Sequence, residues 1–284
     1  MPTAIERAFL TFIDEGFKVY SGYNSYHFNN FRDAPFTYLV DAKTRVVCSQ
    51  GIAIQEFFIL ETLFAQFHPK SILIIGNAFG WSAVIMSILN PEAKVTTIDP
   101  DSVGNAITER IANKNNYAIT VREGYSPQDV KKICAEEFES PVECVFIDAV
   151  HDDEHQYDDF CATVQVASPN CLFLFHDVVN WSMQKSFQQI IDKSGLVGRI
   201  LQRTTSGIGM VCSQELFEKL RFVISCFADD DISEAEHLFG RKYQIALRDR
   251  PQITQPLHAI KTFIRRLIPN AIFKYIKPLI SRDR

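Results

Sequence analysis

The sequence lacks any long hydrophobic run. Hydrophobic residues make up 46% of its 284 positions, but no apolar stretch approaches the ~20 residues that a membrane-spanning helix requires. The first ten residues contain Glu6 and Arg7 and no continuous apolar segment, so a signal peptide is not expected. These absences argue against an integral membrane protein and favour a globular, cytoplasmic one.

Paired cysteines are absent as well. The seven cysteines are scattered without a C-x-x-C pair, and several lie inside apolar runs, as Cys144 and Cys171 do. We expect buried, reduced thiols rather than disulfides or a catalytic nucleophile.

The glycine fingerprint of dinucleotide-binding proteins is incomplete. The apolar run Ile72–Ile75 is typical of a parallel strand covered on both faces, and a turn from Gly76 to Gly80 follows it. The third glycine of G-x-G-x-x-G would fall on Trp81. A second β-like run ends at Asp99, whose carboxylate can bind a ribose diol. The sequence therefore predicts an adenosine ligand without a pyrophosphate.

Strand and helix patterns alternate along the chain. This alternation predicts a parallel, doubly wound sheet with right-handed crossovers, and residues 199–212 predict a terminal antiparallel hairpin around a Thr-Ser-Gly turn. The expected fold class is α/β, a Rossmann-like, mostly parallel seven-stranded sheet with N- and C-terminal helical extensions. Besides the hairpin, the expected strands are 72–75, 95–98, 119–122, 144–147 and 172–175, and the expected helices are 3–16, 51–67, 82–89, 102–114, 127–138, 153–166 and 181–193.

In this order the motifs resemble those of class I S-adenosylmethionine-dependent O-methyltransferases, particularly the metal-dependent catechol O-methyltransferase type. Gly124–Gln128 is similar to the loop against the adenine, and Val145–Asp148 and Phe175–Asp177 are similar to the strand ends that hold a divalent metal. The pattern Phe-Ile-Asp-x-x-His followed by Phe-His-Asp also resembles bacterial methyltransferases of sugars and secondary metabolites. The resemblance places S-adenosyl-L-methionine against Gly76, Asn77, Ala78, Phe79, Gly80, Trp81, Ser82, Asp99, Gly124, Ser126 and Asp148.

Two positions depart from that family. An acidic residue that binds the methionine amino group usually stands two residues before the first glycine, where this chain has Ile74. The catechol enzymes follow their second metal-binding aspartate with asparagine, whereas Val178 follows Asp177 and His176 precedes it here. The first departure predicts weaker cofactor binding or loss of catalysis, and the second leaves the third metal ligand open.

Asp148 and Asp177 end neighbouring strands, and their carboxylates are expected to face one crevice. Two carboxylates suit Mg²⁺, and His176 as a third ligand would suit Mn²⁺ better. The predicted metal ligands are therefore Asp148, His176 and Asp177. Alternatively, Asp148 contacts only the cofactor, Asp177 caps a helix and His176 forms a hydrogen bond within the crevice.

His151 lies three residues after Asp148, where the catechol enzymes carry a lysine base. An imidazole titrates near neutrality and can accept the proton of a substrate hydroxyl, so His151 and Asp148 are the predicted catalytic residues. Alternatively, His151 starts a helix and bonds to Asp152 or Asp153.

Two segments flank this core. The aromatic-rich stretch Tyr20–Tyr38 is expected to form a loop over the core, where it could stack on an acceptor. Residues 257–284 hold seven Lys or Arg and one Asp, a charge of +6 that leaves −11 for the rest of the net −5 chain. Their apolar positions repeat at helical spacing, which fits peripheral contact with an anionic membrane, docking on the acidic body, or a homodimer contact. The acidic body argues against nucleic-acid binding.

The sequence thus predicts an S-adenosylmethionine-dependent O-methyltransferase, assisted by Mg²⁺ or Mn²⁺, that acts on a hydroxyl of a sugar, glycan or other small molecule. The predicted parts are an N-terminal helix and aromatic-rich cap (1–50), a methyltransferase domain (51–215) and a C-terminal helical extension (216–284). The alternative is a methyltransferase-fold binding module that has lost catalysis, which Ile74 favours.

Overall fold

The computed structural model describes residues 2–21 and 36–228, all within the first of the two units into which the chain divides, Met1–Ile232. Most of the Tyr20–Tyr38 stretch and the basic segment 257–284 lie outside the described residues, as do the membrane and dimer contacts predicted for that segment. None of the helices in the described part of the chain combines the length and apolar composition needed to cross a bilayer. The part boundaries predicted near residues 50 and 215 stay a prediction.

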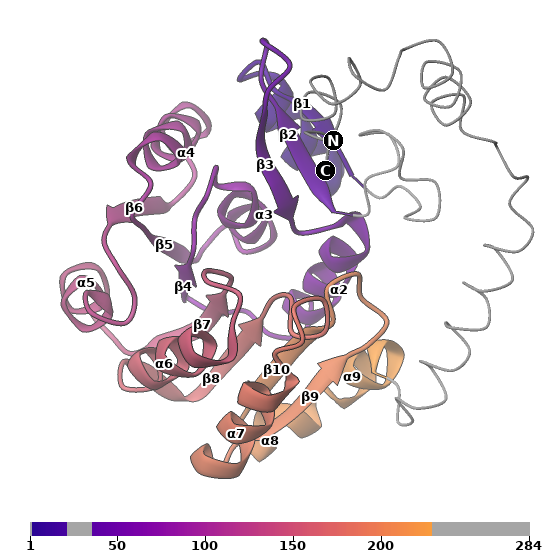
Figure 1. Cartoon of the computed structure of the whole chain (residues 1–284), viewed down its shortest axis with the longest axis vertical. Helices are drawn as coiled ribbons and strands as arrows, with labels where there is room; N and C mark the ends of the chain where they lie inside the picture. The colour runs from indigo at the N-terminus through magenta and orange to yellow at the C-terminus, as the bar shows by residue number, and fades with distance from the viewer. Residues whose placement is uncertain (1, 22–35, 229–284) are drawn as a thin grey trace, which may run out of the picture. The chain divides into compact units, whose positions relative to one another are not determined.

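A seven-stranded sheet forms the centre of this unit, in the order β6-β5-β4-β7-β8-β10-β9 (Figure 1). The strands β4 to β8 pair in parallel, and β10 runs antiparallel to both β8 and β9. The predicted fold class is confirmed. The strands are β4 (Ser71–Ile75), β5 (Lys94–Asp99), β6 (Ile119–Glu123), β7 (Val142–Ile147), β8 (Ala167–Phe175), β9 (Val197–Leu201) and β10 (Ile208–Cys212).

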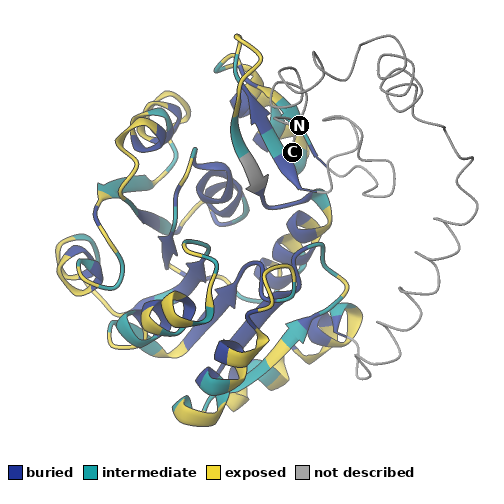
Figure 2. Cartoon of the chain, viewed as in Figure 1, coloured by how far each residue is buried: buried dark blue, intermediate teal, exposed yellow. Residues whose placement is uncertain are grey.

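The central strand β4 is buried on both faces, as its continuous apolar sequence predicts. Because successive side chains of a strand point to opposite faces, Ile72 and Ile74 enter one hydrophobic core, while Leu73 and Ile75 enter the other. The strands around β4 are correspondingly dark in the burial view (Figure 2). This two-sided burial fixes the sheet between two layers of helices.

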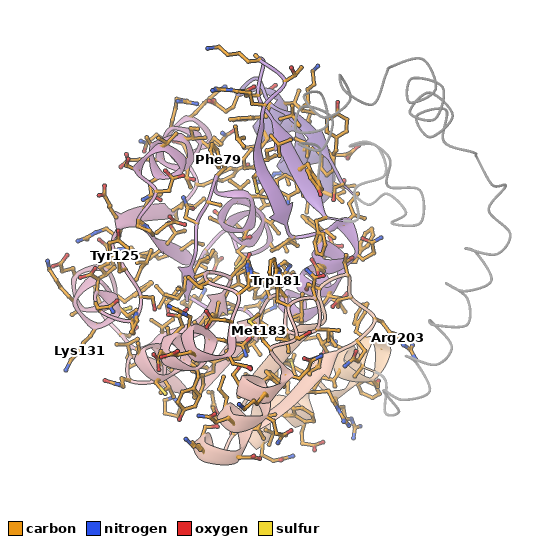
Figure 3. All side chains as sticks on the ribbon, viewed as in Figure 1. Phe79, Tyr125, Lys131, Trp181, Met183 and Arg203 are labelled. Carbon is orange, nitrogen blue, oxygen red and sulfur yellow. The ribbon has the colours of Figure 1, made fainter. Side chains whose placement is uncertain are left out.

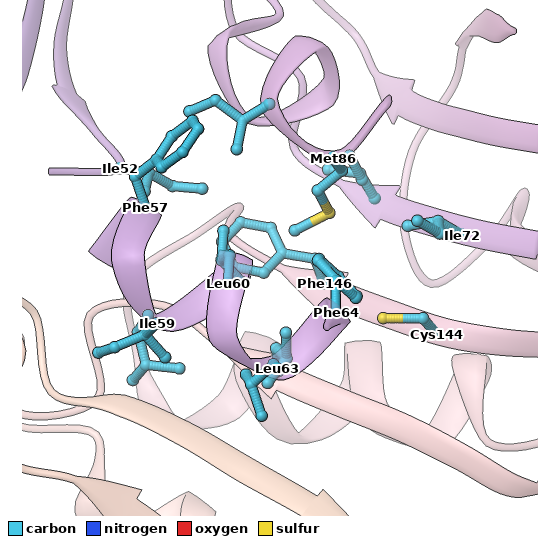
Figure 4. Close-up of a cluster of buried hydrophobic side chains, with 14 of the residues drawn as sticks. Ile52, Phe57, Ile59, Leu60, Leu63, Phe64, Ile72, Met86, Cys144 and Phe146 are labelled. Carbon is cyan, nitrogen blue, oxygen red and sulfur yellow. The ribbon is translucent and has the colours of Figure 1, made fainter. Parts of the chain in front are cut away.

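Helices α1, α2 and α3 contribute to the first core, and α5, α6 and α7 contribute to the second. Figure 4 shows α2 laying its aromatic and aliphatic side chains against strand residues of the first core. The helices are α1 (Ala4–Ile13), α2 (Ile54–Phe64), α3 (Trp81–Leu89), α4 (Ser102–Asn115), α5 (Val130–Glu137), α6 (Asp153–Thr163), α7 (Gln184–Ser194), α8 (Gln214–Lys219) and α9 (Arg221–Phe227).

The N-terminal segment contains strands that the sequence did not predict. Strands β1 (Lys18–Tyr20), β2 (Thr37–Val40) and β3 (Val46–Gly51) form a separate antiparallel sheet. Tyr20 and Tyr38, expected in a loop, are paired with each other across β1 and β2. These strands form because separate segments pair with one another in antiparallel fashion. Such pairing leaves no periodic pattern in the sequence of either segment. Because β3 extends to Gly51, α2 begins at Ile54 and not at the predicted residue 51.

Trp81, the first residue of α3, connects this helix to the N-terminal segment. Its side chain is buried, its Nε1 donates to the carbonyl of Ile52 at 2.9 Å, and its ring packs against Phe9 and Phe12 at centroid distances of 5.6 and 5.2 Å. The indole therefore connects α1, the segment before α2, and α3.

Replacing Trp81 with Phe is expected to lower the free energy of unfolding by about 1–3 kcal/mol. The buried Ile52 carbonyl loses one of its two donors and keeps only Thr37 Oγ1, and the smaller ring fills less of the core. Urea denaturation followed by circular dichroism measures this change. Trp181, the second tryptophan of the chain, is 46% exposed and supplies the matched control. Trp181→Phe should change stability by no more than about 0.5 kcal/mol, and equal effects of the two substitutions would contradict the role assigned to Trp81.

Candidate functional site

The turn after β4 depends on two glycines with left-handed backbone angles. Gly76 has φ +93°, and a Cβ there would lie 2.0 Å from the carbonyl oxygen of Asp148. Gly80 has φ +79° and caps α3, and its Cβ would lie 2.4 Å from Thr108 Oγ1. A side chain at either position would collide with the neighbouring segment. L-residues also rarely adopt such backbone angles. The turn therefore lies tightly against both the end of β7 and the face of α4.

Asp99, at the end of β5, holds the same turn by its carboxylate. Oδ2 accepts hydrogen bonds from the backbone N–H groups of Asn77 at 2.7 Å and Ala78 at 2.9 Å, and Oδ1 accepts from Asp101 at 2.7 Å. The side chain of Asn77 points into the protein and donates to Asn105 Oδ1 and Thr108 Oγ1 on α4. Asp99 thus shapes the turn as well as lying beside it, and ribose binding through this carboxylate stays a prediction.

A cavity of about 520 Å³ lies along the carboxyl ends of these strands, a volume within the range of small-molecule sites. Three segments after β4, β6 and β8 carry Phe79, Tyr125 and Trp181, which Figure 3 labels. Gly80, His176 and Asp177 are not part of the cavity lining. The predicted residues that line it are Gly76, Asn77, Ala78, Phe79, Trp81, Ser82, Asp99, Gly124, Ser126, Asp148 and His151.

Two carboxylates and two imidazoles meet at one end of this cavity. Asp148 Oδ1 lies 3.4 Å from His151 Nε2 and 3.2 Å from His176 Nδ1. Asp177 Oδ2 lies 3.1 Å from His151 Nε2 and 3.3 Å from His176 Nδ1. The four side chains form a closed ring, which we call the carboxylate–imidazole cluster. The His176 side chain is fully buried, whereas His151 is 23% exposed, so His151 forms the side toward the cavity.

The electrostatics of the cluster favour the charged forms. Burial alone would lower the pKa of His151, but its contacts with Asp148 and Asp177 outweigh burial and raise that pKa to about 9. Burial alone would raise the pKa of Asp177, but the close imidazoles hold it well below its ordinary value. The pKa of His176 is raised because the charges of nearby carboxylates outweigh burial. Without a ligand, His151 is therefore protonated near neutral pH and is not poised to act as a base.

The cluster has the donor set of a divalent cation site. Three ligand atoms, one each from Asp148, His151 and Asp177, lie within 4.8 Å of one another. Two carboxylate oxygens and one imidazole nitrogen suit Mn²⁺ and related ions. Asp177 Oδ2 is buried and has no aligned hydrogen-bond donor. This oxygen can therefore still coordinate a cation. The residues fit a cation. His151, rather than the predicted His176, completes this set, and the ligand role of His176 stays a prediction.

Comparisons with known proteins agree with this geometry. Residues 73–178, from β4 to just beyond Asp177, match the family model described as "Methyltransferase domain". No curated protein matches the chain. The match spans the glycine turn, the end of β5 and the whole cluster. Residues 73–178 are thus similar to a methyltransferase domain.

Solved structures share the fold of this methyltransferase domain. The O-methyltransferase from Bacillus cereus in complex with SAH has a TM-score of 0.51 at 17% identity, covering 59% of this chain and 84% of that one. The O-methyltransferase TomG from Streptomyces achromogenes, involved in tomaymycin synthesis and solved with SAM, has a TM-score of 0.51 at 13% identity, covering 75% of this chain and 90% of that one. At these identities the likeness establishes the architecture.

Three further residues that the sequence did not predict belong to the site. Asp159 of α6 lines the cavity, and its buried carboxylate accepts from Ser126 Oγ at 2.5 Å. Trp181 stacks on His151 at a centroid distance of 5.2 Å and an interplanar angle of 10°. Glu56 of α2 lies fully buried behind His176. A single acid in the largely apolar segment Ile52–Leu60, beside Gln55, was the signal for Glu56, whereas contacts between residues distant in sequence produce the other two.

Replacing Asp99 with Ala is expected to weaken binding of S-adenosylhomocysteine by about 10- to 100-fold, equivalent to about 1–3 kcal/mol. The turn loses the acceptor for the N–H groups of Asn77 and Ala78, and the ligand loses its predicted carboxylate partner. Calorimetry measures the affinity. Asp101→Ala is the matched control, since Asp101 only caps α4, and it should cost stability without weakening binding. Undiminished affinity in Asp99→Ala would refute the predicted placement of the ligand.

Replacing Asp159 with Asn is expected to raise the melting temperature at pH 7. Burial raises the pKa of Asp159, so the folded state favours the neutral acid, and stability is lost as pH rises through the window above the unfolded pKa of about 4. Asparagine keeps the acceptor for Ser126 without the buried charge. Thermal unfolding from pH 4 to 8 should show the gain shrinking toward pH 4. The exposed Asp158→Asn is the control, and a lower melting temperature for Asp159→Asn at pH 7 would contradict this account.

Proposed function

We propose that the protein is an S-adenosylmethionine-dependent O-methyltransferase that acts, with a divalent metal, on a hydroxyl of a sugar, glycan or other small metabolite. The proposal rests on one observation: the glycine turn lines the same cavity as Asp148 and His151 of the carboxylate–imidazole cluster. A methyl donor and an activated hydroxyl must meet in one such space. The SAH and SAM complexes of the two structural neighbours support the choice of donor.

The chain's own residues bind and orient the donor in this proposal. The free N–H groups at the start of α3 and the Asp99 carboxylate line the cavity side that suits the ribose and the methionine portion. Gly124 and Ser126 line the part assigned to the adenine. S-adenosylmethionine supplies the electrophilic methyl group when bound. The protein contributes position and exclusion of water.

Asp148, Asp177 and His151 would hold the metal. A bound divalent cation orients a substrate hydroxyl and lowers its pKa. A cation bound to the two carboxylates would also offset the negative charge that keeps the pKa of His151 near 9. The base role predicted for His151 thus depends on the cation. Metal ligand and general base are alternative roles for this side chain.

The acceptor is proposed to lie against Trp181. This indole is 46% exposed beside the cluster and stacks on His151. Tyr125, which lines the cavity, is 64% exposed. Exposed aromatic rings beside a catalytic centre offer a flat apolar surface for a sugar or phenol ring. The sugar preference also follows from the resemblance to bacterial sugar methyltransferases.

A binding module without catalysis is the second candidate, and Ile74 favours it. This side chain is fully buried in the first core and offers no carboxylate for the amino group of the donor. Calorimetry with S-adenosylhomocysteine, together with a turnover assay on sugar and phenol acceptors, separates the two. Binding without turnover on any acceptor would favour the module.

Chelation is expected to abolish methyl transfer while leaving the affinity for S-adenosylhomocysteine unchanged, because Asp99 and the glycine turn hold the donor without the cation. Addition of Mg²⁺ or Mn²⁺ should restore turnover, and addition of Na⁺ at equal ionic strength is the control. Full activity in excess chelator would remove the metal from the mechanism.

A further inference from the structure

A fifth ionisable side chain, Glu56, is buried behind the cluster. It is fully buried on α2 and does not line the cavity. Its Oε2 lies 3.0 Å from His176 Nε2. A buried carboxylate costs free energy unless it is paired and hydrogen-bonded. Its presence in a helix that otherwise packs apolar side chains on the sheet therefore requires a specific set of partners.

The carboxylate of Glu56 joins three segments of the chain. Oε2 accepts from the backbone N–H of Ala53 at 2.9 Å, and Oε1 accepts from that of Ser206 at 2.8 Å. The Ser206 carbonyl in turn accepts from the N–H groups of Val179 at 3.1 Å and Asn180 at 3.2 Å. Glu56 thus connects the start of α2, the β9–β10 turn and the segment that follows Asp177.

His176 links Glu56 to the cluster. Its Nε2 faces Glu56, and its Nδ1 faces one oxygen of Asp148 at 3.2 Å and one of Asp177 at 3.3 Å. The ring also lies beside Phe146 at a centroid distance of 5.9 Å, which restricts its rotation. Because both ring nitrogens face carboxylates, the imidazole acts as a spacer between Glu56 and the two aspartates.

We propose that Glu56 is a positioning residue for the metal site, which acts through His176 to fix the separation of the Asp148 and Asp177 oxygens. This inference rests on the metal-assisted function proposed above. His176 supports the ligands here instead of being one of them. Partners that orient metal ligands from behind govern affinity for the ion even though they never touch it.

Glu56→Gln tests the proposal by Mn²⁺ titration of the full chain, with free Mn²⁺ followed by electron paramagnetic resonance. The affinity for Mn²⁺ is expected to fall by about 10- to 100-fold, as for other residues that orient ligands. Affinity for S-adenosylhomocysteine, measured by calorimetry, should be unchanged because Glu56 lies outside the cavity. Glu61→Gln is the matched control, an exposed glutamate on the same helix that should alter neither affinity.

A double-mutant cycle with His176→Gln tests the route. If Glu56 acts through His176, adding Glu56→Gln to His176→Gln should cost no further Mn²⁺ affinity. A full further loss would overturn this route. Glu56→Asp, which keeps the charge but withdraws the oxygens by one methylene, replaces Glu56→Gln if that variant folds poorly, and its Mn²⁺ affinity should also fall.

Equal Mn²⁺ affinity in the parent and the folded Glu56 variants would overturn the positioning role, even if the melting temperature fell. That result would leave the proposed function standing. A parent protein that retains no Mn²⁺ would contradict the metal-assisted function itself and would overturn this inference with it.

Discussion

The contact between Gly76 and the backbone of Asp148 connects the two halves of the site. Parallel pairing of β4 with β7 brings the glycine turn and the end of β7 to one edge of the sheet. A Cβ on Gly76 would lie 2.0 Å from the Asp148 carbonyl oxygen, so the missing side chain sets how closely the glycine turn approaches the cluster. Close approach matters because methyl transfer requires the two reacting atoms in near contact.

Around this contact, the methyltransferase domain concentrates charge in a buried place. Asp177, His176 and Glu56 are essentially inaccessible to water, and each would be costly alone. Alternation of carboxylates and imidazoles offsets that cost, since every charged group faces one of opposite sign. The same arrangement raises the pKa of His151 and so favours its protonated form in the ligand-free chain.

The position of Ile74 shows how packing and chemistry compete on one strand. The residue lies in the first core and pairs with Phe146 of β7, where a carboxylate would be desolvated. An apolar side chain there contributes to the core and offers no carboxylate to a ligand. The turn itself is held by Asp99, whose carboxylate accepts from the backbone N–H groups of Asn77 and Ala78.

The sequence by itself determined the layered α/β sheet, the turn at Gly76–Gly80, and the placement of Asp99, Asp148 and Asp177 at strand ends. Those features depend on local periodicity and on glycine, which residues nearby in sequence encode. Only the tertiary structure decided that His176 faces Glu56, that Trp181 covers His151, and that β1–β3 form a second sheet. These contacts join residues up to 120 positions apart, and the sequence pattern around each partner carries no trace of the other.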